Sequence, residues 1–92
     1  MKTRAHIKVT GRVQGVYFRS TAREVAMEMG ITGWVRNVPD GSVEIVAEGE
    51  KEKIEKFIKW CWKGPPLAIV ENVEVKWEEY KNEFKSFEVR YR

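Results

Sequence analysis

The pattern of apolar and polar residues along this chain predicts five strands. At residues 5–10, Ile7 and Val9 alternate with polar neighbours, which is typical of a strand with one face in water. The same two-residue period recurs at 73–77 and 87–91, and two short strands are predicted at 34–38 and 43–47. The turn sequence Pro39-Asp40-Gly41 joins the second and third of these strands into a hairpin.

Two other stretches repeat their apolar residues with the helical period and predict amphipathic helices. The first stripe consists of Ala22, Val25, Ala26 and Met29, and the second of Ile54, Phe57, Ile58 and Cys61. Gly30 closes the first helix as a C-cap, and Gly64-Pro65-Pro66 ends the second. The start of the first helix is open between a capping box, Thr21 with Glu24, and a position one turn earlier, near Phe18.

The order strand, helix, strand, strand, helix, strand, with one additional C-terminal strand, predicts an α+β fold. It favours the ferredoxin-like arrangement, an α/β sandwich with an antiparallel sheet and two helices on one face. At 92 residues the chain has room for one core, so we predict a single domain, residues 1–92. A helical crossover returns the chain to its starting end, so the first and second strands run the same way on either side of one strand. Their carboxyl ends should therefore lie about 10 Å apart.

A glycine-bracketed loop follows the first strand and ends in an arginine. Residues 11–19 read Gly-Arg-Val-Gln-Gly-Val-Tyr-Phe-Arg and lead into the first helix. Such a loop can turn several backbone N–H groups inward, at the positive end of a helix and beside the Arg19 guanidinium, which favours a phosphate group. The loop contains no Asp, Glu, His, Ser or Cys. A ligand there would meet charge stabilisation but no evident nucleophile or proton carrier.

Arg19 and Asn37 each have a structural interpretation beside the functional one. An arginine is most often a surface salt-bridge partner, and Asn is a common residue next to a turn such as 39–41. The flanking glycines favour a ligand for Arg19. The expected position of Asn37, at the end of the second strand and opposite Arg19, favours a functional role for it as well.

Composition narrows the class of protein further. The net charge of +3, without a block of basic residues, suits an anionic ligand without requiring nucleic acid. The single cysteine, Cys61, excludes an internal disulfide and a cysteine metal cluster, and the dispersed glutamates offer no metal constellation, so we expect no metal and no organic cofactor. The N-terminus has no apolar signal region and no stretch is long enough to span a membrane, which predicts a cytoplasmic protein.

Other residues are assigned structural roles. Ten Lys and thirteen Glu stand against one Asp and one Gln, a bias typical of hyperthermophilic proteins, so we predict a thermostable protein. His6 falls on the solvated strand face. Cys61 falls on the apolar helix stripe and should be buried and inert. Trp60 and Trp62 cannot both share the face of Cys61, so at least one of them should be partly exposed.

Two stretches give the chain a resemblance to the acylphosphatase family over its whole length. Residues 11–19 are similar to the phosphate-loop signature of that family, and residues 33–43 (Gly-Trp-Val-Arg-Asn-Val-Pro-Asp-Gly-Ser-Val) form the second match. The resemblance implies an acylphosphatase, which hydrolyses carboxyl-phosphate mixed anhydrides to carboxylate and phosphate. It implies that Arg19 binds the phosphate and that Asn37 orients the attacking water. The implied phosphate cradle consists of the backbone N–H groups of Gln14, Gly15, Val16, Tyr17, Phe18 and Arg19.

The chemistry of acyl phosphates agrees with this loop. A carboxylate is a good leaving group, so no general acid is needed, and a loose phosphoryl-transfer transition state mainly requires positioning and charge stabilisation. The expected partners are an acyl phosphate as substrate and inorganic phosphate as product and inhibitor. We expect no nucleic acid and no membrane as partners, and a monomer.

RNA-binding domains share this order of strands and helices, but they stack bases on aromatic residues of the central strands. The third strand, residues 42–48, has no aromatic residue and contains Glu44 and Glu48, which disfavours that function. A non-catalytic anion sensor and a detached domain of a larger maturation protein stay open. The initiator Met1 favours a free-standing enzyme.

Overall fold

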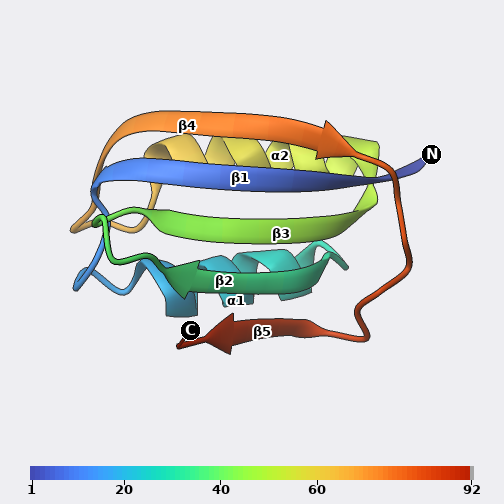
Figure 1. The fold of residues 1–92 in the computed structure, drawn as a ribbon, viewed down its shortest axis with the longest axis horizontal. Helices are drawn as coiled ribbons and strands as arrows, with labels where there is room; N and C mark the ends of the chain where they lie inside the picture. The colour runs from blue at the N-terminus through green and yellow to red at the C-terminus, as the bar shows by residue number, and fades with distance from the viewer. Residues whose placement is uncertain (92) are drawn as a thin grey trace.

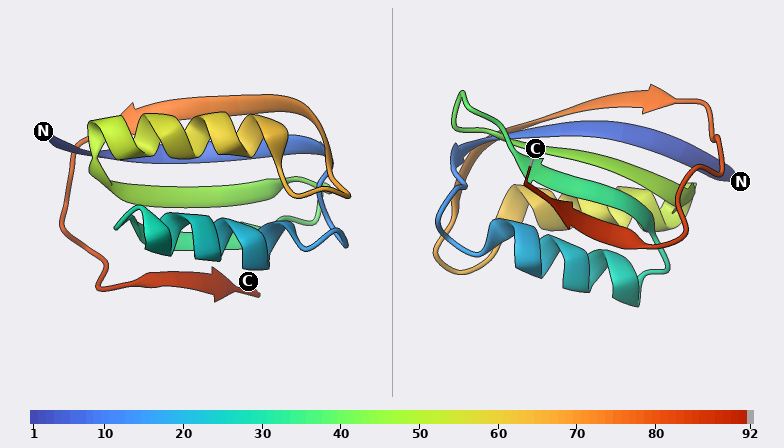
Figure 2. Two further views of the ribbon diagram at one scale, coloured as in Figure 1. Left: turned by 180° about the vertical axis from the view of Figure 1, so that it is seen from behind. Right: turned by 60° about the horizontal axis from the view of Figure 1, so that its bottom comes forward.

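A five-stranded sheet with two helices against one face forms the fold (Figure 1). The computed structural model describes residues 1–91. The elements are β1 (Lys2–Arg12), α1 (Phe18–Glu28), β2 (Thr32–Asn37), β3 (Val43–Glu50), α2 (Lys51–Lys63), β4 (Ile69–Glu78) and β5 (Phe87–Arg90). The strands lie in the order β4-β1-β3-β2-β5. Figure 2 shows both helices on the same side of the sheet, which confirms the predicted ferredoxin-like α+β fold.

The register of the central strands brings the ends of β1 and β2 together. β3 pairs antiparallel with β1 on one side and with β2 on the other. Val9 of β1 and Asn37 of β2 both lie opposite Val43 of β3. The carboxyl ends of β1 and β2 therefore meet at one edge of the sheet with a single strand between them, as the topology predicts.

β5 lies at the edge of the sheet and pairs with β2 in parallel, so the antiparallel arrangement is limited to the other four strands. The connection from β4 passes along one end of the sheet before β5 begins, as Figure 1 shows. The buried carboxylate of Glu48 holds this connection, because it accepts hydrogen bonds from the backbone N–H groups of Lys81 (2.7 Å) and Glu83 (2.9 Å). Arg4 approaches the same carboxylate, with 3.5 Å between its NH1 nitrogen and Glu48 Oε2.

The predicted apolar stripes form the core between sheet and helices. Side chains without exposed surface include Ile7, Val9, Ala22, Ala26, Ile54, Phe57 and Cys61. Burial raises the pKa of the Cys61 thiol, which agrees with an inert cysteine. Trp60 packs against Phe18, with ring centroids 5.2 Å apart, whereas Trp62 is 49% exposed. The structure thus decides which of the two tryptophans is the exposed one.

Two aromatic residues that the alternation assigns to the inner face are exposed instead. Trp77, 43% exposed, lies near the end of the edge strand β4, where the ammonium of Lys51 lies 5.5 Å from its ring centroid. Tyr91, 81% exposed, follows the last residue of β5. Alternation predicts the side of a strand on which a residue lies. It does not predict whether a second layer covers that side.

Candidate active site

The loop between β1 and α1 has a left-handed backbone at two positions. Gly15 has φ 74° and Tyr17 has φ 66°. A methyl group added to Gly15 would meet no atom within 4 Å, so the left-handed backbone, and not crowding, favours glycine there. α1 begins at Phe18, the earlier of the two predicted starts, and no side chain caps it, so the predicted capping box of Thr21 with Glu24 is wrong.

The backbone N–H groups of this loop are available to a ligand. Those of residues 15–19 donate to no acceptor within residues 1–91. The carbonyl of Tyr17, in contrast, accepts hydrogen bonds from the backbone N–H of Thr21 (3.1 Å) and from its hydroxyl (2.8 Å). A row of unpaired donors at the positive end of a helix is an arrangement that binds phosphate and other anions.

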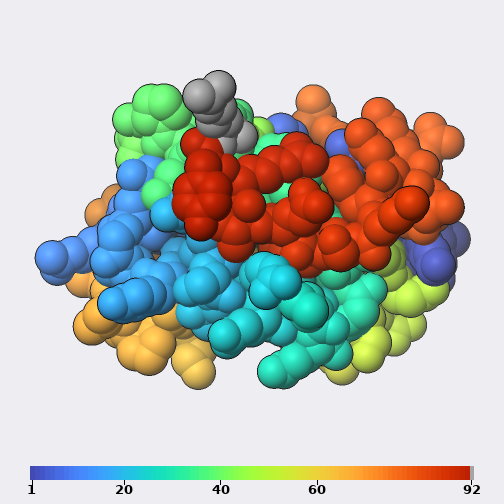
Figure 3. All heavy atoms as spheres, turned by 90° about the horizontal axis from the view of Figure 1, so that it is seen from below, coloured from blue at the N-terminus to red at the C-terminus, as the bar shows by residue number. Residues whose placement is uncertain are grey.

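Arg19 and Asn37 line one cavity of about 340 Å³ together with loop residues that include Gly15 and Tyr17. The guanidinium of Arg19 lies 5.0 Å from the ring centroid of Tyr91, the residue that follows β5. No carboxylate in the described part of the chain lies within 4.0 Å of it, so the salt-bridge interpretation finds no partner there. In Figure 3 the end of the red β5 segment lies beside the blue loop.

Asn37 carries an unpaired acceptor at this cavity. Its Oδ1 atom is buried and has no hydrogen-bond partner among the described residues. The turn after β2 does not need this side chain, because Asp40 accepts hydrogen bonds from the hydroxyl (2.6 Å) and backbone N–H (2.9 Å) of Ser42. These bonds lower the pKa of Asp40 to about 2. A buried oxygen in a folded protein normally accepts at least one hydrogen bond. A molecule bound in the cavity would supply it.

Gln14 connects the loop to the strand that carries Asn37. Its Nε2 donates hydrogen bonds to the carbonyls of Val38 (2.8 Å) and Ser42 (2.9 Å), at the two ends of the β2–β3 turn. Gln14 does not line the cavity, and neither does Val16, which is buried. Of the predicted phosphate-binding set, Gly15, Tyr17, Phe18 and Arg19 line the cavity, and Asn37 joins them.

Four lining residues were not predicted from the sequence: Val13, Ser20, Val89 and Tyr91. The last two come from β5 and the residue after it. β5 pairs with β2 so that Arg90 lies opposite Arg36, which carries Tyr91 toward Asn37. Val89 and Tyr91 could have been found only from the parallel pairing of β5 with β2. The alternating pattern of 87–91 predicts a strand but does not indicate which strand it pairs with.

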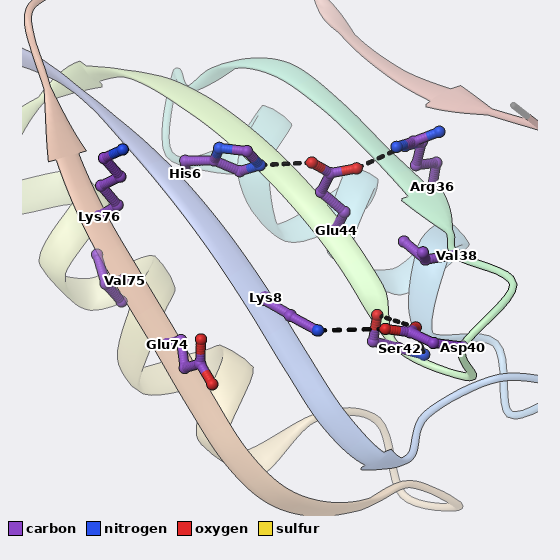
Figure 4. A pocket seen from close by; sticks show the side chains of 10 residues that line it. All are labelled: His6, Lys8, Arg36, Val38, Asp40, Ser42, Glu44, Glu74, Val75 and Lys76. Carbon is purple, nitrogen blue, oxygen red and sulfur yellow. Dashed lines mark hydrogen bonds and ion pairs between the residues drawn. The ribbon is translucent and has the colours of Figure 1, made fainter.

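A larger cavity, of about 420 Å³, lies on the sheet face away from the helices (Figure 4). Its charged side chains are largely paired with one another. Glu44 accepts hydrogen bonds from His6 (2.5 Å) and Arg36 (2.6 Å), and Lys8 Nζ lies 3.1 Å from Asp40. Burial works against ionisation of Glu44, but these hydrogen bonds outweigh it and hold its pKa below the ordinary value. This cavity contains neither Arg19 nor Asn37.

Fold and site together define a ferredoxin-like α+β domain with a polar cavity where β1 and β2 end. The family model for acylphosphatase matches residues 5–89, and the chain belongs to the acylphosphatase family. It is therefore an enzyme that hydrolyses acyl phosphates.

Relatives match the chain over almost its whole length. It is 52% identical to an acylphosphatase of Pelotomaculum thermopropionicum, over 98% of each chain. It is 54% identical to an acylphosphatase of Aeropyrum pernix, over 96% of this chain and 88% of that one. Among solved structures, an acylphosphatase from Coxiella burnetii superposes with a TM-score of 0.92 at 43% identity, over 97% of this chain and 93% of that chain.

Replacing Gln14 by Met should destabilise the fold. Met has a similar length, but it removes both side-chain hydrogen bonds of Gln14, while the carbonyls of Val38 and Ser42 each keep one backbone donor. We expect the free energy of unfolding to fall by about 1–3 kcal/mol, measured by urea denaturation at pH 7. Thr10→Val is the control, because it removes one longer side-chain hydrogen bond, to the exposed Asn72 carbonyl (3.5 Å), elsewhere on β1. Equal losses in the two variants would contradict this account of Gln14.

Proposed function

We propose that the cavity lined by Arg19 and Asn37 is the active site, in which the loop holds the phosphoryl group and Asn37 holds the attacking water. The proposal rests on one observation: unpaired hydrogen-bond donors and an unpaired acceptor line the same cavity. Among residues 1–91, the loop offers N–H donors without acceptors, and Asn37 Oδ1 is a buried acceptor without a donor. A phosphoryl group and a water molecule would satisfy both.

The phosphoryl oxygens would accept hydrogen bonds from the loop N–H groups and from the Arg19 guanidinium. Arg19 presents two N–H bonds in a planar fork that matches two oxygens of one phosphoryl group. The amides at the start of α1 add fixed partial positive charge. These donors would stabilise the charge spread over the equatorial oxygens in the transition state.

Asn37 Oδ1 would accept a hydrogen bond from the water and aim its oxygen at phosphorus. The water oxygen bonds to phosphorus while the bond from phosphorus to the acyl oxygen breaks, and the electron pair of that bond goes to the carboxylate. One water proton passes to a phosphoryl oxygen, so a dianionic acyl phosphate and water become a carboxylate and dihydrogen phosphate. A neutral amide suits this position, because a carboxylate would repel the phosphoryl group.

No protein acid or base enters this scheme. The leaving carboxylate is stable without a proton, and the substrate itself takes the proton of the water. Within residues 1–91, no three His, Cys, Asp or Glu side chains gather as metal ligands. The enzyme would thus accelerate hydrolysis by position and charge, with inorganic phosphate as product and competing ligand.

We also propose that residues 1–92 act as a single-domain, monomeric, thermostable enzyme of the cytoplasm. The high content of Lys and Glu supports thermostability. No helix of residues 1–91 is long and apolar enough to cross a bilayer. The small site requires no second chain, because loop, Arg19 and Asn37 come from one sheet edge.

Arg19→Gln should lower kcat about a hundredfold or more, by analogy with the loss of one strong oxyanion donor. Phosphate affinity should fall with it, because the guanidinium acts on ground state and transition state alike. Arg19→Lys should restore only part of the rate, since an ammonium lacks the planar fork. The readout is turnover of benzoyl phosphate together with phosphate binding by calorimetry.

Arg12→Gln is the matched control for charge, because Arg12 is exposed and lies outside the cavity lining. It should keep nearly the full rate. A folded Arg19→Gln protein with the wild-type rate would exclude Arg19 from the active site.

Asn37→Ala should separate phosphate binding from turnover. The side chain would act on the water, so kcat should collapse, while phosphate still binds and still raises Tm by mass action. Both quantities are measured on one folded sample, with Asn72→Ala on β4 as the control for loss of an exposed Asn. Parallel losses of phosphate affinity and kcat would make Asn37 a phosphate ligand. Unchanged values of both would place the water elsewhere.

A further inference from the structure

Two exposed tyrosine rings adjoin the cavity that holds Arg19 and Asn37. Tyr17 is 73% exposed and Tyr91 is 81% exposed, and both line this cavity. They come from opposite ends of the chain, one at the start of α1 and the other after β5. Single exposed aromatic residues are common on protein surfaces. Two that border the same polar cavity need a separate account.

Tyr17 occupies a backbone conformation that a bulky residue avoids. Its φ of 66° and ψ of 25° lie in the left-handed region, which glycine or asparagine adopts more readily. The exposed ring buries little surface against the core, so packing does not offset this strain. Strained residues of this kind gather at functional sites. The ring of Tyr17 is thus held at the cavity at a cost to the fold.

Tyr91 has one interaction that fixes its place. The Arg19 guanidinium lies 5.0 Å from its ring centroid, within the range of a cation–π contact. Much of the ring is open to solvent, because the side chain is largely exposed. A flat group bound in the cavity could therefore stack on the ring without displacing Arg19.

The cavity is larger than a phosphoryl group needs. Its volume of about 340 Å³ falls in the range of small-molecule sites, about 300–1,000 Å³, so it has room for part of a substrate besides the phosphoryl group. Val13 and Val89 add apolar surface to the lining. Arg19 is the single charged side chain among the described residues that line it, and the phosphoryl group would engage that charge. A second anionic group on the substrate would find no second cationic side chain among the described lining residues.

We propose that Tyr17 and Tyr91 form the subsite for the acyl group, and that the enzyme favours acyl phosphates whose acyl part is flat, apolar and uncharged. This inference rests on the proposed active site. It predicts a higher kcat/KM for benzoyl phosphate than for acetyl phosphate, which is too small to reach both rings. It predicts a lower kcat/KM for succinyl phosphate than for benzoyl phosphate, because the described lining residues offer its free carboxylate no counter-charge besides Arg19.

The test compares these three substrates in the wild-type protein and in Tyr17→Gly. Glycine adopts the left-handed backbone freely, so this variant keeps the loop while it removes the ring. We expect KM for benzoyl phosphate to rise about twofold to twelvefold, the range of an aromatic pair, and to rise more than KM for acetyl phosphate. Trp62→Ala, which removes an exposed ring on α2 outside the cavity, should change neither value.

Tyr91→Leu provides a second, independent variant. It removes the stacking surface and also the contact with Arg19, so the rate should fall on all substrates, but most on benzoyl phosphate. The decisive quantity is the ratio of kcat/KM for benzoyl phosphate to that for acetyl phosphate. A lower ratio in either tyrosine variant supports the subsite, and an unchanged ratio in both overturns it.

Different results would exclude the proposed active site and the acyl subsite. A folded wild-type protein that leaves all three acyl phosphates intact overturns the proposed function and the subsite with it. A wild-type protein that hydrolyses them, with tyrosine variants that lose rate equally on benzoyl and acetyl phosphate, overturns the subsite alone. A preference of the wild-type protein for succinyl phosphate over benzoyl phosphate also overturns it.

Discussion

One side chain, Gln14, connects the two halves of the candidate site directly. Both of its amide protons are used, one on the carbonyl of Val38 and the other on that of Ser42. The first half of the site is the loop that leads to Arg19, and the second is the end of β2 that carries Asn37. Sheet topology brings these two ends close, and the buried side chains of Val13, Val16 and Phe18 anchor the loop on the core. The Gln14 bonds add a direct connection between the loop and the turn after β2.

The same region leaves polar groups unpaired where a folded protein normally pairs them. Among residues 1–91, the N–H groups of loop residues 15–19 lack acceptors and the buried Asn37 oxygen lacks a donor. A buried oxygen without a donor costs free energy. The tight core of α1 and α2 against the sheet offsets this cost, with Phe18 at the first residue of α1 packed on Trp60 directly behind the loop. The candidate site thus has few hydrogen bonds among its own polar groups, while the packed core behind it holds the loop in place. This combination suits the binding of a small anion.

Local patterns in the sequence were enough to predict the strands, the helices and the core residues. The ferredoxin-like topology then followed from their order, and it placed Arg19 and Asn37 at one edge. Three features depend on tertiary contacts that no local pattern encodes. The parallel direction of β5 depends on the connection that Glu48 holds. The exposure of Trp77 and Tyr91 depends on what covers the end of each strand. The role of Gln14 depends on a turn that lies 24 residues away in the sequence. For Gln14 the sequence predicts a backbone N–H in the phosphate cradle, and the structure adds the side-chain hydrogen bonds to the carbonyls of Val38 and Ser42.

The central claim is that loop and Asn37 work as one unit because Gln14 connects them. A double-mutant cycle on kcat for benzoyl phosphate tests it most directly, with Gln14→Met and Asn37→Ala made singly and together, well below the Tm of the least stable variant. If Gln14 acts by aligning Asn37 with the phosphoryl group, Gln14→Met lowers kcat in the wild-type background and changes it little once Asn37 is absent. If the two losses multiply instead, Gln14 and Asn37 act independently, and the connection between the two halves of the site is not what sets the rate.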